Sequence, residues 1–86
     1  MSIPLDEQLL FFDRHAEKAY VQCLRAFKER REPILCEARR RMAEGYSSYG
    51  DTSFHKTHKE LRQEELEEMA DAVVYRLMRI RNGWPT

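Results

Sequence analysis

The residues with the clearest capacity for chemistry lie near the end of the 86-residue chain, in the stretch EELEEMADAVVY at positions 64 to 75. This stretch carries five carboxylates on an otherwise largely apolar segment. Glu68 and Asp71 are three residues apart and Glu64 stands one turn before them, so a helix puts all three on one face. Mg²⁺ prefers carboxylate oxygens, water and substrate phosphate as ligands. One interpretation is therefore a magnesium site held by these three acids.

The other interpretation of this segment is an amphipathic helix whose acids face water. Its apolar stripe lies opposite the acids and consists of Leu66, Met69, Ala70, Val73, Leu77 and Ile80. Acids early in the helix and arginines late also suit the helix dipole. However, the back of the helix turns apolar around Tyr75, and a helix that is apolar on two sides is usually enclosed on both. This pattern predicts that Glu68 and Asp71 are partly covered, and covered carboxylates need cations.

Residues 67 to 75, EEMADAVVY, resemble the second metal-binding helix of the all-α nucleoside triphosphate pyrophosphohydrolases, the MazG-like group. That helix carries an E-x-x-D pair within a similar segment. The resemblance implies that Glu68 and Asp71 bind Mg²⁺ in a helical bundle completed by dimerisation. It also implies hydrolysis of a nucleotide between its α and β phosphates. The family's E-E-x-x-E set on the preceding helix is missing here, where residues 37 to 44 read EARRRMAE.

A second resemblance covers roughly the second half of the chain. Residues 42 to 51, MAEGYSSYGD, followed by the acidic helix, are similar to small proteins encoded by bacteriophages of actinobacteria. Those proteins combine a Gly-x-x-x-Tyr-Gly-Asp loop with an E-E-x-x-D-type helix. The resemblance implies a viral accessory protein that acts in the host cytoplasm.

Positive charge is concentrated around the first junction between helices, at Arg25, Lys28, Arg30, Arg31, Arg39, Arg40 and Arg41. In the nucleotide-hydrolase interpretation Arg40 and Arg41 bind the phosphates, for which arginine is well suited. The alternative is pairing with acids of the last helix, in the same or a neighbouring subunit. We favour pairing because acids are interspersed and the chain has no net formal charge. For the same reason nucleic-acid binding is not expected.

Composition and length indicate a small helical protein, and the cysteine pattern favours a cytoplasmic location, which is the host cytoplasm if the protein is viral. Fifteen Lys and Arg balance fifteen Asp and Glu, and Gly and Pro are scarce. The two cysteines lack C-x-x-C spacing and no apolar signal segment is evident, which favours a reducing compartment. No apolar run approaches the roughly 20 residues that a membrane-spanning helix needs.

The fold class that these patterns predict is all-α, with three helices in one domain. A long first helix is expected at about residues 4–32, a short basic one at 33–44 and a long third at 58–81, with a loop at 45–57. Pro33 separates the first two, Gly45 caps the second, and Thr57 with Glu60 forms a capping box for the third. We expect these helices to form a bundle that dimerisation completes.

The first helix carries apolar residues at alternating steps of four and three, a spacing typical of a packing seam with a partner helix. The seam consists of Leu5, Leu9, Phe12, Ala16, Ala19, Cys23 and Ala26. The side chains at the centre of the seam are small, so a partner helix could approach closely there. We therefore expect self-association, with a homodimer favoured.

Two functional hypotheses follow. The first is a protein-protein interaction module of phage type, without a complete catalytic set or cofactor, that binds itself and a host protein. The second is a Mg²⁺-dependent, MazG-like nucleotide pyrophosphohydrolase that uses Glu68 and Asp71, with Glu64 and Arg40 or Arg41 assisting.

Overall fold

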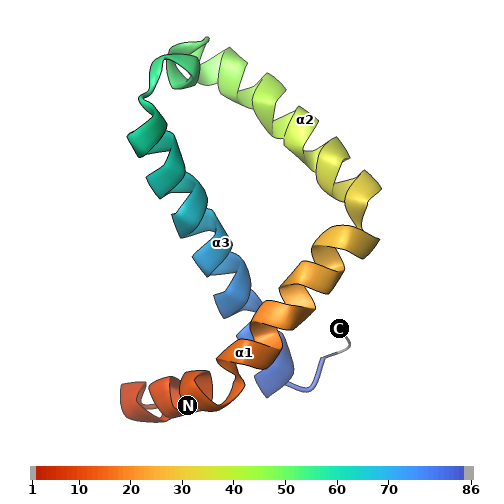
Figure 1. The fold of residues 1–86 in the computed structure, drawn as a ribbon, viewed down its shortest axis with the longest axis vertical. Coiled ribbons are helices and arrows are strands. Elements are labelled where there is room, and N and C mark those ends of the chain that lie inside the picture. The colour runs from red at the N-terminus through yellow and green to blue at the C-terminus, as the bar shows by residue number, and fades with distance from the viewer. Residues whose placement is uncertain (1, 85–86) are drawn as a thin grey trace.

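The computed structural model describes residues 2–84, apart from the side chain of Ser53, and it confirms the all-α fold class. No strand occurs among these residues. The elements, shown in order in Figure 1, are α1 (Leu5–Glu29), α2 (Arg31–Tyr49), the short 3-10 helix η1 (Thr52–His55) and α3 (His58–Arg81).

Both ends of α3 lie where the sequence predicts them, because local hydrogen bonds fix them. At the start, the backbone N–H of Glu60 donates to Thr57 Oγ1 at 3.1 Å, which satisfies one of the free donors of the first turn. At the end, Gly83 has φ +70°, its N–H donates to Ile80 O, and the N–H of Trp84 donates to Arg79 O. This pair of bonds around a left-handed glycine is the Schellman motif.

The break between α1 and α2 falls at Arg30, two residues before the predicted one. A continuous helix would press the Pro33 ring against the carbonyl four residues earlier, at Glu29, and α1 ends at that residue. Helix α2 can then begin at once, because the first turn needs no N–H from Pro33. Its first hydrogen bond runs from Ile34 N–H to Arg30 O at 3.1 Å.

Helix α2 extends to Tyr49, five residues beyond the predicted end, so the expected cap at Gly45 is wrong. Gly45 has an ordinary helical φ, and the left-handed cap is Gly50, with φ +62°. The Gly50 N–H donates to Tyr46 O at 2.8 Å and closes the last turn. A single glycine costs a helix only about 1 kcal/mol relative to alanine, so Gly45 does not by itself stop α2. The predicted loop at 45–57 shrinks to the residues around η1.

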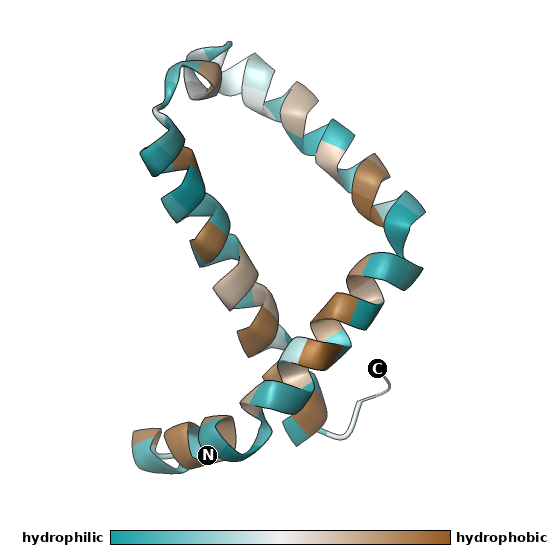
Figure 2. Ribbon diagram, viewed as in Figure 1, coloured by the Kyte–Doolittle hydropathy of each residue, from teal (hydrophilic) through white to brown (hydrophobic). Residues whose placement is uncertain are grey.

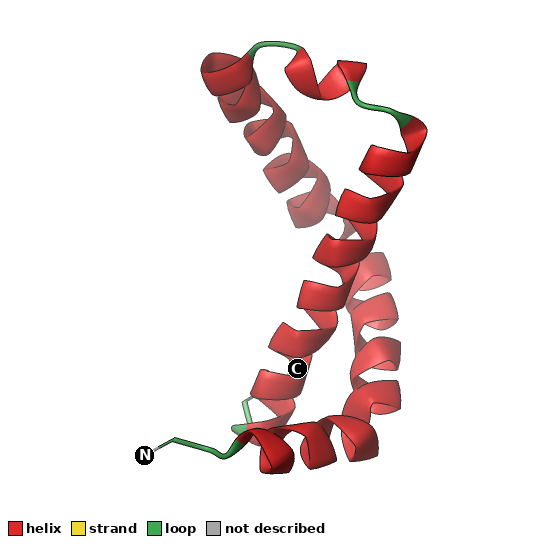
Figure 3. Ribbon diagram, turned by 90° about the vertical axis from the view of Figure 1, so that its left-hand side faces the viewer, coloured by secondary structure: helices red, strands yellow, loops and turns green. Residues whose placement is uncertain are grey.

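The three long helices form an open frame (Figure 1). Helices α1 and α3 cross and make the main tertiary contact, whereas α2 joins them at the two other corners and has no buried residue. The first turns of α1 run crosswise to the rest of that helix, which Figure 3 shows from the side. They bring the start of α1 to the last turns of α3.

The core sits at the α1–α3 crossing and is small. Ala19 is fully buried, and Leu77 and Arg76 are each 7% exposed. Helix α1 packs against the backbone of α3 here, since Cys23 Sγ lies 3.5 Å from the carbonyl oxygen of Ala72. The radius of gyration is 16.0 Å, against the roughly 12 Å expected for a compact domain of this length. One chain is therefore an incompletely packed body, with apolar segments distributed around the frame (Figure 2).

Candidate functional site

Glu64, the first of the three predicted metal ligands, is engaged by a lysine. Lys56, just before α3, donates from Nζ to Glu64 Oε1 at 2.8 Å and to Oε2 at 3.0 Å. Hydrogen bonding to Glu64 raises the pKa of Lys56 above its ordinary value. In this structure the charge that neutralises the Glu64 carboxylate is thus an ammonium group of the same chain.

Glu68 and Asp71 share a face of α3 as predicted, but both are exposed. The whole segment 58–72 is exposed, because α1 crosses α3 only in its second half and α2 does not cover it. The enclosure on two sides expected for these acids does not occur within one chain. Among the described residues, no group of three or more His, Cys, Asp and Glu side chains is placed to hold a metal ion.

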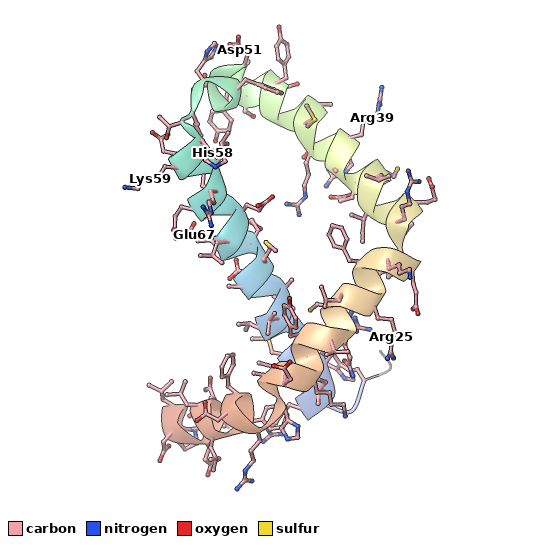
Figure 4. The ribbon with its side chains drawn as sticks, in the orientation of Figure 1. Arg25, Arg39, Asp51, His58, Lys59 and Glu67 are labelled. Atoms are coloured by element: carbon pink, nitrogen blue, oxygen red, sulfur yellow. The ribbon has the colours of Figure 1, made fainter. Side chains whose placement is uncertain are left out.

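Arg40 and Arg41, the predicted phosphate-binding residues, form ion pairs within α2. Arg40 Nε donates to Glu37 Oε2 at 3.0 Å, and its terminal nitrogens contact Glu37 and Glu44. Arg41 Nε donates to Glu37 Oε1 at 3.3 Å. Their acidic partners thus lie three and four residues away on the same helix, not on α3 as the sequence suggested. Arg39, by contrast, extends outward from the frame (Figure 4).

These pairs predict a pH dependence for Glu37. Hydrogen bonds from Arg40 and Arg41 lower the pKa of this carboxyl from 4.5 to about 2. A carboxyl whose pKa is lower in the folded state than in the unfolded state stabilises the folded state at pH values above its unfolded-state pKa. This contribution is lost as the pH falls through the folded-state pKa. We expect the support that Glu37 gives to α2 to be complete above pH 4.5 and lost by about pH 2.

An NMR titration of the Glu37 side-chain carboxyl checks this expectation. Its midpoint should lie near 2 in the unmodified protein and move towards 4.5 in an Arg40→Gln/Arg41→Gln variant. An unmodified protein that titrates at the same pH as the variant would show that the pairs do not persist in solution.

The predicted seam of α1 divides into two parts in the structure. Its small centre packs on α3 of the same chain: Ala19 is fully buried, and Ala16, Cys23 and Ala26 are partly buried. The large residues at its start stay exposed, and further apolar side chains extend them along α1. This exposed stripe, called here the α1 stripe, consists of Leu5, Leu9, Phe12, Tyr20, Leu24 and Phe27. Close approach at the small centre is thus used within one chain, whereas self-association stays a prediction.

Part of the α1 stripe borders an apolar groove of about 410 Å³ between the start of α1 and the end of α3. Phe12 and Leu9 line one side, and Val74, Leu77 and Met78 line the other. The groove contains no acidic side chain and no nucleophile. Its largely apolar lining suits an apolar side chain of another protein.

A second groove, of about 290 Å³, lies where the end of α1, the start of α2 and the second half of α3 meet. We call it the arginine groove. Its lining consists of Cys23, Ala26, Phe27, Arg30, Ile34, Ala72, Tyr75, Arg76 and Arg79. Arg76 is only 7% exposed, and it makes no hydrogen bond or ion pair with any residue in 2–84. Three guanidinium groups in a largely apolar groove are the most unusual feature of this surface.

The sequence interpretation missed this groove because it treated the late arginines of α3 as surface residues that suit the helix dipole. The available signal was the position of Arg76, which lies three residues after Val73 and four before Ile80 and so falls within the apolar stripe. An arginine at such a position is buried whenever a neighbouring helix covers the stripe.

Comparison with family models, with curated proteins and with solved structures finds no match for this chain. No helix within residues 2–84 combines the length and the apolar character needed to cross a membrane.

Proposed function

We propose that this protein acts by binding other protein chains, and first of all a second copy of itself. The observation that carries the proposal is the exposed surface of one chain. It measures 7979 Å², whereas a folded monomer of 10.4 kDa is expected to expose only about 5,400 Å². A chain that leaves this much surface open has not finished burying its apolar residues.

The surplus is large enough for a stable dimer. A standard protein-protein interface removes about 800 Å² from each partner, and one chain here exposes about 2,600 Å² more than a compact monomer would. Much of the exposed surface is apolar, as the exposure of Phe27 (71%), Tyr75 (67%) and Met42 (62%) illustrates. A second copy of the chain supplies surfaces of the same kind, and isologous pairing buries both sets at once.

Molar mass in solution tests the proposal. Sedimentation equilibrium should give about twice the chain mass of 10.4 kDa at micromolar concentration. Because association buries apolar surface, raising NaCl to 1 M should not abolish it. A mass of one chain at every concentration up to 100 µM would overturn the proposal.

The resemblance to phage-encoded proteins extends the proposal to a second partner, a host protein met in the host cytoplasm. The apolar groove at the start of α1 supports this extension, since its lining suits an apolar side chain of another protein. The balance of fifteen basic and fifteen acidic residues favours a protein over a nucleic acid as partner.

The alternative function, a Mg²⁺-dependent hydrolase, requires metal ligands in addition to Glu68 and Asp71. Glu68 and Asp71 lie on one helix face, and two carboxylates from one helix hold Mg²⁺ only weakly without further ligands. A hydrolase would therefore need a second acidic set from another chain, brought close by dimerisation. None of the described contacts favours this alternative over the interaction module.

A further inference from the structure

We propose that the arginine groove receives the acidic first half of α3 from a second copy of the chain, where Glu65 of that copy pairs with the buried Arg76. This inference rests on the proposed self-association and specifies its contact. The arrangement is reciprocal, so each chain contributes one groove and one acidic segment.

Arg76 has no anionic partner among the described residues of its own chain. Its side chain is 7% exposed and has no hydrogen-bonding or ionic partner within residues 2–84. The Arg76 guanidinium still faces the groove, because its nitrogens are not among the buried unpaired side-chain atoms of the described residues. A second chain seated in the groove would remove this guanidinium from water, and a carboxylate on that chain would offset the cost through charge-assisted hydrogen bonds. Phe27 and Tyr75 flank the groove, and aromatic residues with arginine are the types that contribute most to protein interfaces.

Glu65 is the matching carboxylate. It lies four residues from both Leu61 and Met69, so all three share one face of α3. Leu61 is 43% exposed, Met69 is 60% exposed, and Glu65 forms no ion pair among the described residues. If this apolar patch is buried against another protein, Glu65 is carried into the interface and needs a cation there.

The two groups cannot meet within one chain. Glu65 and Arg76 are eleven residues apart on a single helix, about 16 Å along its axis. Their separation matches an antiparallel pair of α3 helices instead. When Glu65 of one copy faces Arg76 of the other, the reverse pair forms at the same time, and Met69 is set against the small Ala72.

The charge pattern of α3 favours a second copy over another occupant. Its acids all lie between Glu60 and Asp71, and the last ten residues, from Ala72 to Arg81, carry only arginines as charged groups. An antiparallel pair therefore places acidic halves on basic halves at both ends of the contact. The acidic first half of α3 is thus a surface of the chain itself whose charge is complementary to the groove.

Charge reversal in two separate chains tests the pairing. Glu65→Arg and Arg76→Glu should each weaken homodimerisation by about thirtyfold or more, because each brings like charges together twice. Mixing the two variants should restore a heterodimer close to the unmodified affinity, since both pairs then have opposite charges again. Sedimentation equilibrium measures the affinities, and far-UV circular dichroism verifies that each variant is folded.

Glu67→Arg is the matched control. Glu67 lies two residues from Glu65, about 200° around the helix, and is labelled in Figure 4. This variant has the same change in charge and should dimerise as the unmodified chain does. If Arg76→Glu fails to fold, Glu65→Arg still provides the test, paired with Arg76→Gln, which should weaken dimerisation without reversing charge.

The outcomes separate this inference from the function on which it rests. An unmodified chain that is monomeric up to 100 µM would overturn both. A dimer that Glu65→Arg and Glu67→Arg leave equally intact would overturn the groove pairing and leave self-association standing. A dimer that both variants weaken equally would show a response to net charge alone and would also overturn the pairing.

Discussion

Leu77→Ala should lower the free energy of unfolding by about 2–5 kcal/mol, the usual cost of removing a buried leucine side chain. Leu77 is 7% exposed and lies at the α1–α3 crossing, which is the only extensive tertiary contact among the described residues. A core of this size rarely supplies more than about 3–5 kcal/mol, so this variant is expected to be largely unfolded at 37 °C.

Urea denaturation followed by circular dichroism measures this effect, at one fixed protein concentration because the proposed dimerisation would make stability depend on concentration. Leu35→Ala is the matched control, since Leu35 is 49% exposed on α2, where no residue is buried. It should change stability by less than about 1 kcal/mol. Equal losses for the two variants would mean that the α1–α3 crossing is not the core.

Ala19→Leu should destabilise the protein by about 1–3 kcal/mol for the opposite reason, which is overpacking. Ala19 is fully buried, and the helices around it are close enough for Cys23 Sγ to lie 3.5 Å from Ala72 O. Three additional carbon atoms at this point must push α1 away from α3. For a domain of this length the loss corresponds to a fall in Tm of about 4–8 °C per kcal/mol.

Ala43→Leu provides the control for Ala19→Leu. Ala43 is exposed on α2, so the same added atoms meet solvent there. Both residues favour helix, and the expected change is within about 0.5 kcal/mol. A Tm for Ala19→Leu equal to that of Ala43→Leu would contradict the close helix contact at Ala19.

The sequence alone determined the helical class and the third helix at 58–81, because these depend on interactions within a few residues. Apolar periodicity, the Thr57 hydroxyl and the left-handed Gly83 act locally, and the structure has α3 at His58–Arg81 with both caps in place. The boundaries of α2 were less accurate. Pro33 acts on a carbonyl four residues away, and Gly45 competes with Gly50 for the cap, so neither residue could be interpreted in isolation.

Only the tertiary structure decided which apolar surfaces meet. The periodicity of α1 identified a seam but not its partner, and Ala19 packs on α3 of the same chain while Leu9 and Phe12 remain open. Arg76 looked like a surface residue until α1 covered it. The physical reason is that these helices carry more apolar surface than a single crossing can bury. The local sequence pattern shows that a helix has an apolar face to bury. Which helix packs on that face depends on contacts between residues far apart in sequence.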